Sequence, residues 1–175
     1  MRLAAPLVAL AVALPVPAIA QGTDPLPLAQ EVRDPSAEAL QATLYDLIAL
    51  RHAAHQAHWN VVGIEFYQLH EFFAELYDGL APMIDQVAER KRALGAPADG
   101  RPSAVAENAA VDGAEPAEIG GEEAVQRLLE AWSTVSPLMY DRLEAVSDDT
   151  PTQDLLIAVT ALLDKQMWQL RAHAQ

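Results

Sequence analysis

Apolar residues recur every three or four positions along four long stretches of the chain, which is the spacing of one face of an α-helix. The stretches cover residues 36 to about 60, 65–94, about 121–147 and 151–170. Their apolar positions are Leu40, Leu44, Leu47 and Ile48, then Phe66, Leu69, Phe73, Leu76, Ile84 and Val87, then Leu128, Leu129, Trp132, Val135, Leu138, Met139 and Leu143, and finally Leu155, Leu156, Val159, Leu162, Leu163, Met167 and Leu170. No stretch alternates with the period of a strand. The pattern therefore predicts an all-α fold.

Residues with strong preferences for helix ends give the expected boundaries. Ser36 is the expected N-cap of the first helix, after an extended, proline-rich segment over residues 21–35. The first helix should stop near Gly63. Thr150, followed by Pro151, is the expected N-cap of the last helix.

The connection between the second and third helices is rich in Gly, Pro and Ala, and it is too long for a tight turn. It has room for one short helix at residues 103–109. Four long helices with one long connection in the middle favour a ferritin-like four-helix bundle over an up-and-down bundle with short loops. The bundle domain is expected to cover residues 36–174.

Residues 1–20 have the features of a cleaved signal peptide: the basic Arg2, an apolar run, and Ala18-Ile19-Ala20 as a small-residue cleavage site. The alternative is an uncleaved membrane anchor, but Pro15 and Pro17 interrupt the run and it is short for a membrane span. We therefore expect a bacterial protein that is periplasmic or otherwise exported, without a membrane segment after cleavage. The chain has no cysteine, so its stability must come from its core or from assembly.

The chain is strongly acidic, with 25 Asp and Glu against 11 Lys and Arg and a formal net charge of −14. Loss of Arg2 with the signal peptide would make the charge one unit more negative. Nucleic-acid binding needs clustered Lys and Arg, so no nucleic-acid partner is expected. An acidic surface attracts cations, and the alternative interpretation is that it only keeps the protein soluble.

Two carboxylates, together with histidines, form the candidate metal ligands. Asp85 and Glu89 lie four residues apart in the second helix and therefore share one face. Such pairs are common on solvated helix faces, but here the apolar Ile84 and Val87 place the pair beside the buried stripe. Together with histidines, these carboxylates form a ligand set that suits iron or zinc.

The histidines and the carboxylates cannot meet within one chain. His70 and Asp85 are fifteen residues apart on one helix, which is about 22 Å at 1.5 Å per residue. An antiparallel two-fold dimer would bring the histidines of each chain to the carboxylates of its partner. A metal site inside one bundle would need Glu-x-x-His on two helices, and the chain has no such motif. The spacing therefore favours a site at a subunit interface.

Three motifs at fixed spacing, "HWNVVG", "FYQLHEFF" and "IDQVAERKRALG", and the closing "KQMWQLRA", resemble the Dps family of miniferritins over residues 36–174. The resemblance implies that His58 and His70 of one subunit, with Asp85 and Glu89 of the next, form a ferroxidase centre. It also implies a shell of twelve subunits, built from two-fold dimers, which oxidises iron with hydrogen peroxide or dioxygen, stores the ferric product and protects against oxidative stress. Zinc is the alternative ion at such a site.

The chain departs from the family pattern at several positions. Ala74 stands where the family usually has an acidic ligand, which should leave one metal position well bound and the second loose. His55, one turn before His58, is a further candidate ligand, with a structural role as the alternative. Pro82 is expected to kink the second helix just upstream of Asp85. The family's Lys-rich DNA-binding tail is missing from the start of the mature chain.

Three functions follow from these observations: an iron-oxidising and iron-storing enzyme, which we favour, a metal-sequestering shell without catalysis, which Ala74 favours, and a structural helical oligomer. Trp59, directly after His58, is either an electron donor in peroxide chemistry or a core residue. Trp132 and Trp168 lie in apolar stripes and are expected to pack in the core.

Overall fold

The structure is a computed structural model that describes residues 26, 28–113 and 115–175. The expected signal peptide and residues 21–25 lie outside these residues. The elements are α1 (Gln30–Asn60), β1 (Val61–Val62), α2 (Phe66–Ala93), α3 (Pro102–Asn108), β2 (Ile119–Gly120), α4 (Gly121–Ala145) and α5 (Thr150–His173). The all-α prediction is confirmed, and the short helix expected near 103–109 is α3.

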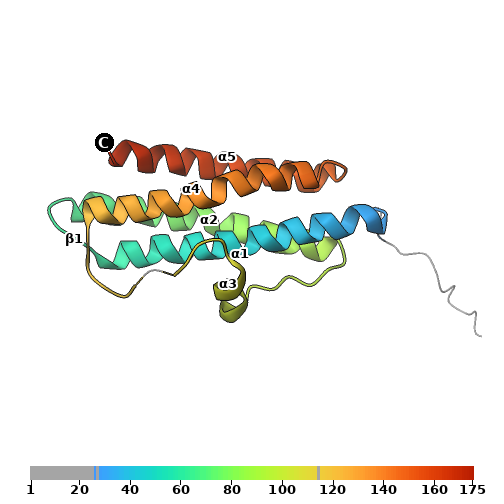
Figure 1. The fold of residues 1–175 in the computed structure, drawn as a ribbon, viewed down its shortest axis with the longest axis horizontal. Coiled ribbons are helices and arrows are strands. Elements are labelled where there is room, and N and C mark those ends of the chain that lie inside the picture. Colours follow the sequence, from blue (N-terminus) through green and yellow to red (C-terminus); the bar gives the residue numbers. More distant parts are fainter. Residues whose placement is uncertain (1–25, 27, 114) are drawn as a thin grey trace, which may run out of the picture.

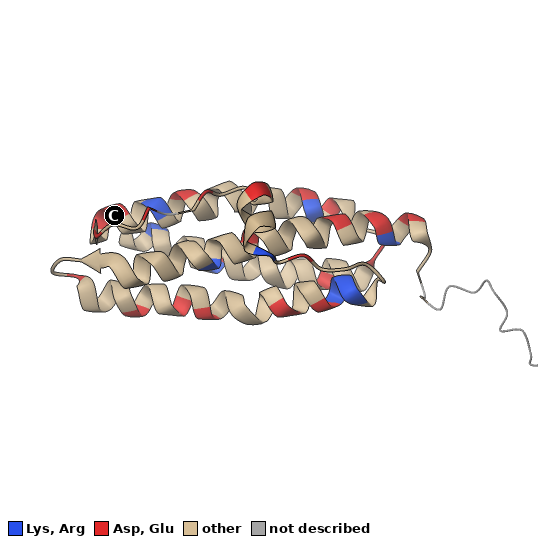
Figure 2. Cartoon of the chain, turned by 90° about the horizontal axis from the view of Figure 1, so that it is seen from below, with Lys and Arg blue, Asp and Glu red and all other residues tan. Residues whose placement is uncertain are grey.

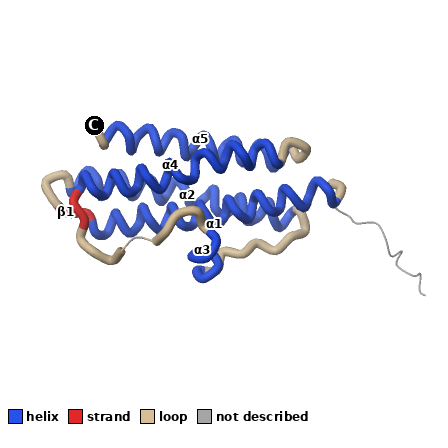
Figure 3. The backbone as a smooth tube through the Cα atoms, viewed as in Figure 1, coloured by secondary structure: helices blue, strands red, loops and turns tan. Residues whose placement is uncertain are grey.

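The four long helices lie side by side in an elongated bundle (Figure 1). α1 packs mainly on α2, and α4 packs mainly on α5. α2 and α4 start at the same end of the bundle and run in the same direction, so the chain must return along the bundle between them. The crossover, with α3 in it, makes this return along α1 (Figures 1 and 3). The predicted four-helix bundle with a long crossover is therefore confirmed.

A two-residue parallel pairing closes the end of the bundle where α2 and α4 begin. Val61 pairs with Ile119, and Val62 pairs with Gly120. Val61 is buried, so the pairing also covers the end of the core. The sequence analysis missed these strands, because two residues are too few to show an alternating pattern.

The core runs along the bundle axis, and Trp132 is its largest fully buried side chain. The Nε1 atom of Trp132 donates a hydrogen bond to Oε1 of Gln166 at 3.0 Å, and Nε2 of Gln166 donates to the Leu76 carbonyl at 3.0 Å. Gln166 thus satisfies the buried Trp132 N–H, adds a second hydrogen bond to the helical Leu76 carbonyl, and connects α4, α5 and α2. The prediction that Trp132 packs in the core is confirmed.

Two predicted helix starts are wrong. α1 begins at Gln30 with Ala29 as N-cap, so residues 30–35 are helical and not extended, and Ser36 is buried inside the helix. Contacts with the bundle stabilise the additional turns, because Leu28 packs on the core and Nη1 of Arg33 donates to the Leu94 carbonyl at 3.5 Å. α5 is capped by Asp149 and not by Thr150. α2 continues as one helix through Pro82.

The surface also differs from the sequence prediction at two aromatic residues. Trp168, expected in the core, is 60% exposed, and Phe66, expected on the buried face of α2, is 43% exposed. Both lie on outer faces of a single chain.

Acidic residues far outnumber basic ones along the helices visible in Figure 2. Among the described residues, no helix is long and apolar enough to cross a membrane.

Candidate metal centre

His58 and His70 lie against each other where α1 ends and α2 begins. Their rings stack with centroids 3.6 Å apart and planes 20° apart. Nδ1 of His58 is 2.7 Å from the His70 carbonyl oxygen, and Nδ1 of His70 is 2.8 Å from the His58 carbonyl oxygen. The short connection Val61–Glu65 reverses the chain so that these residues, twelve apart in sequence, become neighbours.

The reciprocal contacts determine which ring nitrogens are available. A carbonyl oxygen can only accept a hydrogen bond, so each Nδ1 must carry a proton and donate it. In the neutral ring, Nε2 then has a free lone pair, which is the form that binds a metal ion. A histidine ligand in a metal site typically donates its other ring N–H to a carbonyl or carboxylate. Here a carbonyl of the same chain accepts the Nδ1–H of each ring.

The two imidazoles do not converge on one ion. A nitrogen lone pair lies in the plane of its ring. Two rings with centroids 3.6 Å apart and planes only 20° from parallel have planes that meet far beyond an imidazole–metal distance of about 2.1 Å. Each ring therefore suits its own metal position, and the two positions are adjacent. This geometry fits a site for two neighbouring ions.

The candidate carboxylates lie at the opposite end of α2 from His70. Asp85 and Glu89 are both exposed, while Val87 between them is buried and Ile84 is half-buried. The structure thus brings His58 and His70 together and leaves both carboxylates away from them. Within the described part of the chain, no three His, Cys, Asp or Glu side chains are grouped closely enough to hold a metal ion.

Ala74 is half-buried one helical turn after His70, and it offers no oxygen to either ring. Glu71 and Glu75, its acidic neighbours on α2, are exposed. Among the described residues, no carboxylate of α2 joins the two histidines in a group of three that could hold a metal ion.

His55 is enclosed by aromatic rings. Its ring centroid lies 4.0 Å from that of Trp59, 4.2 Å from that of Tyr77 and 6.0 Å from that of His58. Burial and the positive charge of Arg51 lower the pKa of His55 below its ordinary value. Trp59 is 61% exposed, so in a single chain it is not a core residue.

Tyr77 is a feature of this site that the sequence analysis missed. Its ring meets His58 edge to face with centroids 5.3 Å apart, and the Arg51 guanidinium carbon lies 5.9 Å from its centroid. The sequence contains a signal for it, because position 77 is seven residues, or two helical turns, after His70 and thus on the same face of α2.

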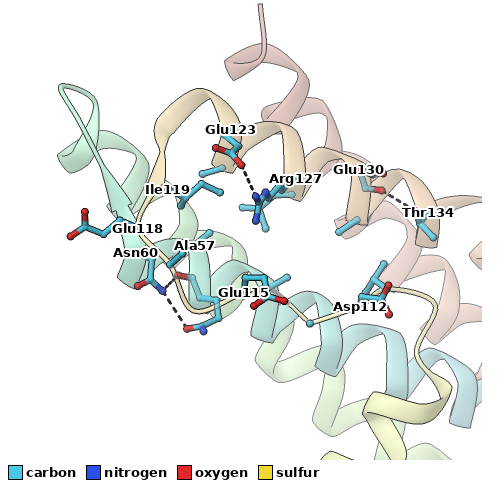
Figure 4. A pocket seen from close by; sticks show the side chains of 18 of the residues that line it. Ala57, Asn60, Asp112, Glu115, Glu118, Ile119, Glu123, Arg127, Glu130 and Thr134 are labelled. Atoms are coloured by element: carbon cyan, nitrogen blue, oxygen red, sulfur yellow. Dashed lines mark hydrogen bonds and ion pairs between the residues drawn. The ribbon is translucent and has the colours of Figure 1, made fainter.

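A pocket of about 490 Å³ lies between α1, the crossover and α4. Figure 4 shows carboxylates around it, including Glu115 and Glu118 of the crossover and Glu123 and Glu130 of α4, with Glu123 paired to Arg127. Neither His58 nor His70 is among the described residues that line it. The pocket is therefore separate from the candidate metal centre.

Comparison with known proteins is consistent with this geometry. Residues 37–175 match the ferritin family, described as a ferritin-like domain. The chain is 34% identical over 141 residues to DNA protection during starvation protein 2 of Deinococcus radiodurans, which covers 80% of this chain and 58% of that protein. It is also 34% identical over 140 residues to DNA protection during starvation protein 2 of Bacillus anthracis, covering 77% of this chain and 93% of that protein.

A solved structure supports the same relationship. The fold is similar to that of the DPS protein from Vibrio cholerae, described as a member of a broad superfamily of ferritin-like diiron-carboxylate proteins. The TM-score is 0.81 and the sequence identity 27%, with 90% of this chain and 100% of that chain covered.

Proposed function

The chain belongs to the Dps family of miniferritins, within the ferritin-like superfamily, and on that premise we propose that it oxidises ferrous iron and stores the ferric product. The observation that carries the proposal is the stacked pair of His58 and His70, with each Nδ1 held by the other's carbonyl. This arrangement presents two imidazole nitrogens as ligands before any metal arrives. Iron is the substrate in this reaction, and zinc is a substitute ion for the same ligands.

We propose that Asp85 and Glu89 reach these imidazoles from a second subunit. The imidazoles and the carboxylates lie at opposite ends of α2, so an antiparallel two-fold dimer places each set opposite the other and builds two equivalent centres. The exposure of Asp85 and Glu89 in the single chain is compatible with this use. Glu89 is the residue we assign as the bridge between the two metal positions, with Asp85 on one of them.

The proposed assembly is a hollow shell of twelve subunits built from these dimers, in the periplasm or otherwise exported. Hydrogen peroxide is the proposed oxidant, with dioxygen as the slower alternative, and its consumption would limit oxidative damage. The relatives are named for DNA protection, but this chain has two lysines and a formal charge of −14, so protection here would not involve DNA binding.

A second candidate function is a shell that binds metal ions without oxidising them. The observation that favours it is Ala74, which leaves one of the two imidazoles with only the shared Glu89 as an acidic ligand. Reduction of one hydrogen peroxide molecule takes two electrons, one from each of two ferrous ions. Weak binding of the second ion would therefore slow the oxidation of iron.

The deciding experiment is an anaerobic titration of the assembled protein with ferrous iron, followed by hydrogen peroxide and stopped-flow recording of ferric absorbance. We expect saturable binding at the centres and rapid oxidation by the parent protein. Glu89→Ala should abolish rapid oxidation and leave the assembly intact, because it removes charge from an exposed position and not core volume.

Glu75→Ala is the matched control, since Glu75 is an exposed glutamate on the same helix. It should oxidise iron at the parent rate. Binding without oxidation by the parent would favour the sequestering shell, and neither binding nor oxidation would leave only a structural role. Unchanged oxidation by Glu89→Ala would disprove the proposed ligand set.

A further inference from the structure

Arg51 carries a positive charge that the single chain does not pair. The residue is half-buried, and its Nε atom is buried without a hydrogen-bond partner among the described residues. No ion pair within the described part of the chain includes it, although the chain has 25 acidic residues. A buried donor without an acceptor is costly. Arg51 therefore has donors to offer to a group outside its own chain.

Asp78 is an unpaired carboxylate on the face of α2 that carries the proposed metal ligands. It follows His70 by eight residues and precedes Asp85 by seven, and both spacings are close to two helical turns. Its side chain is exposed, and none of the ion pairs between described residues involves it. Burial and the charge of Arg51 lower the pKa of His55, and the charge of Asp78 raises it. Both unpaired charges thus act on the same ring.

The proposed dimer places Asp78 next to its two-fold axis. The axis must relate the imidazole end of α2 in one subunit to the carboxylate end in the other, so it passes midway between His70 and the turn of Asp85 and Glu89. That midpoint is at Asp78 and Gly79. A residue beside a two-fold axis meets its own copy. The dimer therefore brings two Asp78 carboxylates close together, and like charges so placed need a nearby cation.

Arg51 lies at the same level of the bundle as this axis. The guanidinium carbon of Arg51 is 5.9 Å from the centroid of the Tyr77 ring, and Tyr77 directly precedes Asp78. One residue advances an α-helix by about 1.5 Å, so Arg51 and Asp78 of the partner subunit differ in level by only a few ångströms. The axis thus brings two unpaired guanidinium groups and two unpaired carboxylates into one region.

We propose that Arg51 of each subunit forms an ion pair with Asp78 of the partner subunit, an inference that rests on the dimer of the proposed function. The two-fold symmetry makes the contact reciprocal, so two identical ion pairs lie on either side of the axis. They also fix the register of the two α2 helices, because a slip by one turn of about 5.4 Å would break both pairs. Arg51 and Asp78 are positioning residues that bring the carboxylates of one subunit to the imidazoles of the other.

The test reverses the two charges in separate full-length chains. Arg51→Glu alone puts two carboxylates at each contact, and Asp78→Arg alone puts two guanidinium groups there. Each variant should weaken subunit association about tenfold or more, measured by sedimentation velocity over a dilution series. Each should also lose peroxide-driven iron oxidation as the dimers dissociate. Circular dichroism verifies that the separate chains remain helical.

An equimolar mixture of the two variants gives the decisive result. A dimer of one chain of each kind has opposite charges at both contacts, so mixing should restore association and iron oxidation to near the parent values. An ion pair within one chain would be broken in both members of the mixture and would not be restored. Arg127→Glu and Asp141→Arg are the matched controls, because they reverse exposed charges on α4, which carries no proposed ligand. Alone and mixed, they should associate like the parent.

A second route covers the case that Arg51→Glu does not fold. Arg51→Met keeps an aliphatic stem beside Tyr77, and adding it to Asp78→Arg removes the repulsion, so the double variant should associate several-fold more tightly than Asp78→Arg. No gain on mixing or in this double variant, or parental association of Asp78→Arg alone, would overturn the inference. Iron oxidation by the parent would then leave the proposed function intact. A parent that neither dimerises nor oxidises iron would overturn both.

Discussion

Replacement of Asp149 should destabilise the bundle more than any other single carboxylate substitution we consider. Asp149 is fully buried and accepts hydrogen bonds from Arg90 Nη2 at 2.7 Å, Thr152 Oγ1 at 2.6 Å and the Thr152 backbone N–H at 3.3 Å. The last of these caps α5. Arg90 directly follows Glu89, so the network also holds the turn of α2 that carries the proposed bridging ligand.

The expected magnitude follows from what each substitution removes. Asp149→Ala loses the helix cap, at about 1 kcal/mol, and leaves the Arg90 guanidinium, whose side chain is 22% exposed, without its carboxylate. An unpaired, largely buried donor group costs a further ~1–3 kcal/mol. The free energy of unfolding should therefore fall by about 2–4 kcal/mol. Asp149→Asn keeps an oxygen that can cap α5, so it should cost only about 1–2 kcal/mol.

Urea unfolding followed by circular dichroism at one fixed subunit concentration measures these differences, since assembly couples stability to concentration. Asp148→Ala is the control, because Asp148 is the exposed neighbour of Asp149. It should change the free energy of unfolding by less than about 0.5 kcal/mol. The argument is wrong if Asp149→Ala costs no more than Asp148→Ala.

The pH dependence gives this prediction a second test. Burial by itself raises the pKa of Asp149, but the hydrogen bonds from Thr152 and the charge of Arg90 outweigh it and lower the pKa below its ordinary value. The carboxylate therefore contributes stability above the unfolded-state pKa of about 3.9, and this contribution is lost as the pH falls through the folded-state pKa. The stability difference between the parent and Asp149→Asn should have its full value at pH 7 and shrink at pH values below about 4. A constant difference down to pH 3 would contradict the network.

Three shorter predictions follow from the same structure. Gln166→Leu should lower the free energy of unfolding by about 1–3 kcal/mol, because it leaves the buried Trp132 Nε1 without a partner and removes the second hydrogen bond to the Leu76 carbonyl; urea unfolding measures it, with the exposed Gln126→Leu as the control. Dilution of the protein to monomers should abolish peroxide-driven iron oxidation, and full activity in a monomer confirmed by ultracentrifugation would refute an interface site. The mature protein should not shift plasmid DNA at pH 7, whereas a salt-sensitive shift would reveal a basic surface that the composition does not predict.

The helices were predictable because each buries one face over many turns, and this repeats the apolar signal often enough to identify it. The helix starts were less predictable, because they depend on single residues. Asp149 and Thr150 are neighbours that can both cap a helix, and the contacts of Asp149 with the half-buried Arg90 and the buried Thr152 decide between them. Ser36 was misassigned because contacts of the first turns with the bundle are invisible in the local sequence.

The candidate centre was predictable to a different degree. The resemblance to the Dps motifs identified His58 and His70 as one set, and helix geometry excluded the meeting of His70 and Asp85 within one chain. The stacking of the two rings and their reciprocal carbonyl contacts were not predictable, because they depend on the three-dimensional course of the short connection between α1 and α2. Neither was the exposure of Trp59, since a tryptophan beside an apolar stripe is equally compatible with a core position.

The separation of the two ligand sets also has a physical consequence for the order of assembly. The imidazoles satisfy each other's carbonyls within one chain, so they need no partner to hold their orientation. Asp85 and Glu89 are like charges one turn apart, and burying them together in a monomer would be costly without a cation. Exposure keeps them hydrated until a second subunit brings them to the imidazoles. In the proposed dimer, ferrous iron then compensates both charges, so iron binding should stabilise the dimer, and the reactive centre exists only where two subunits have already paired.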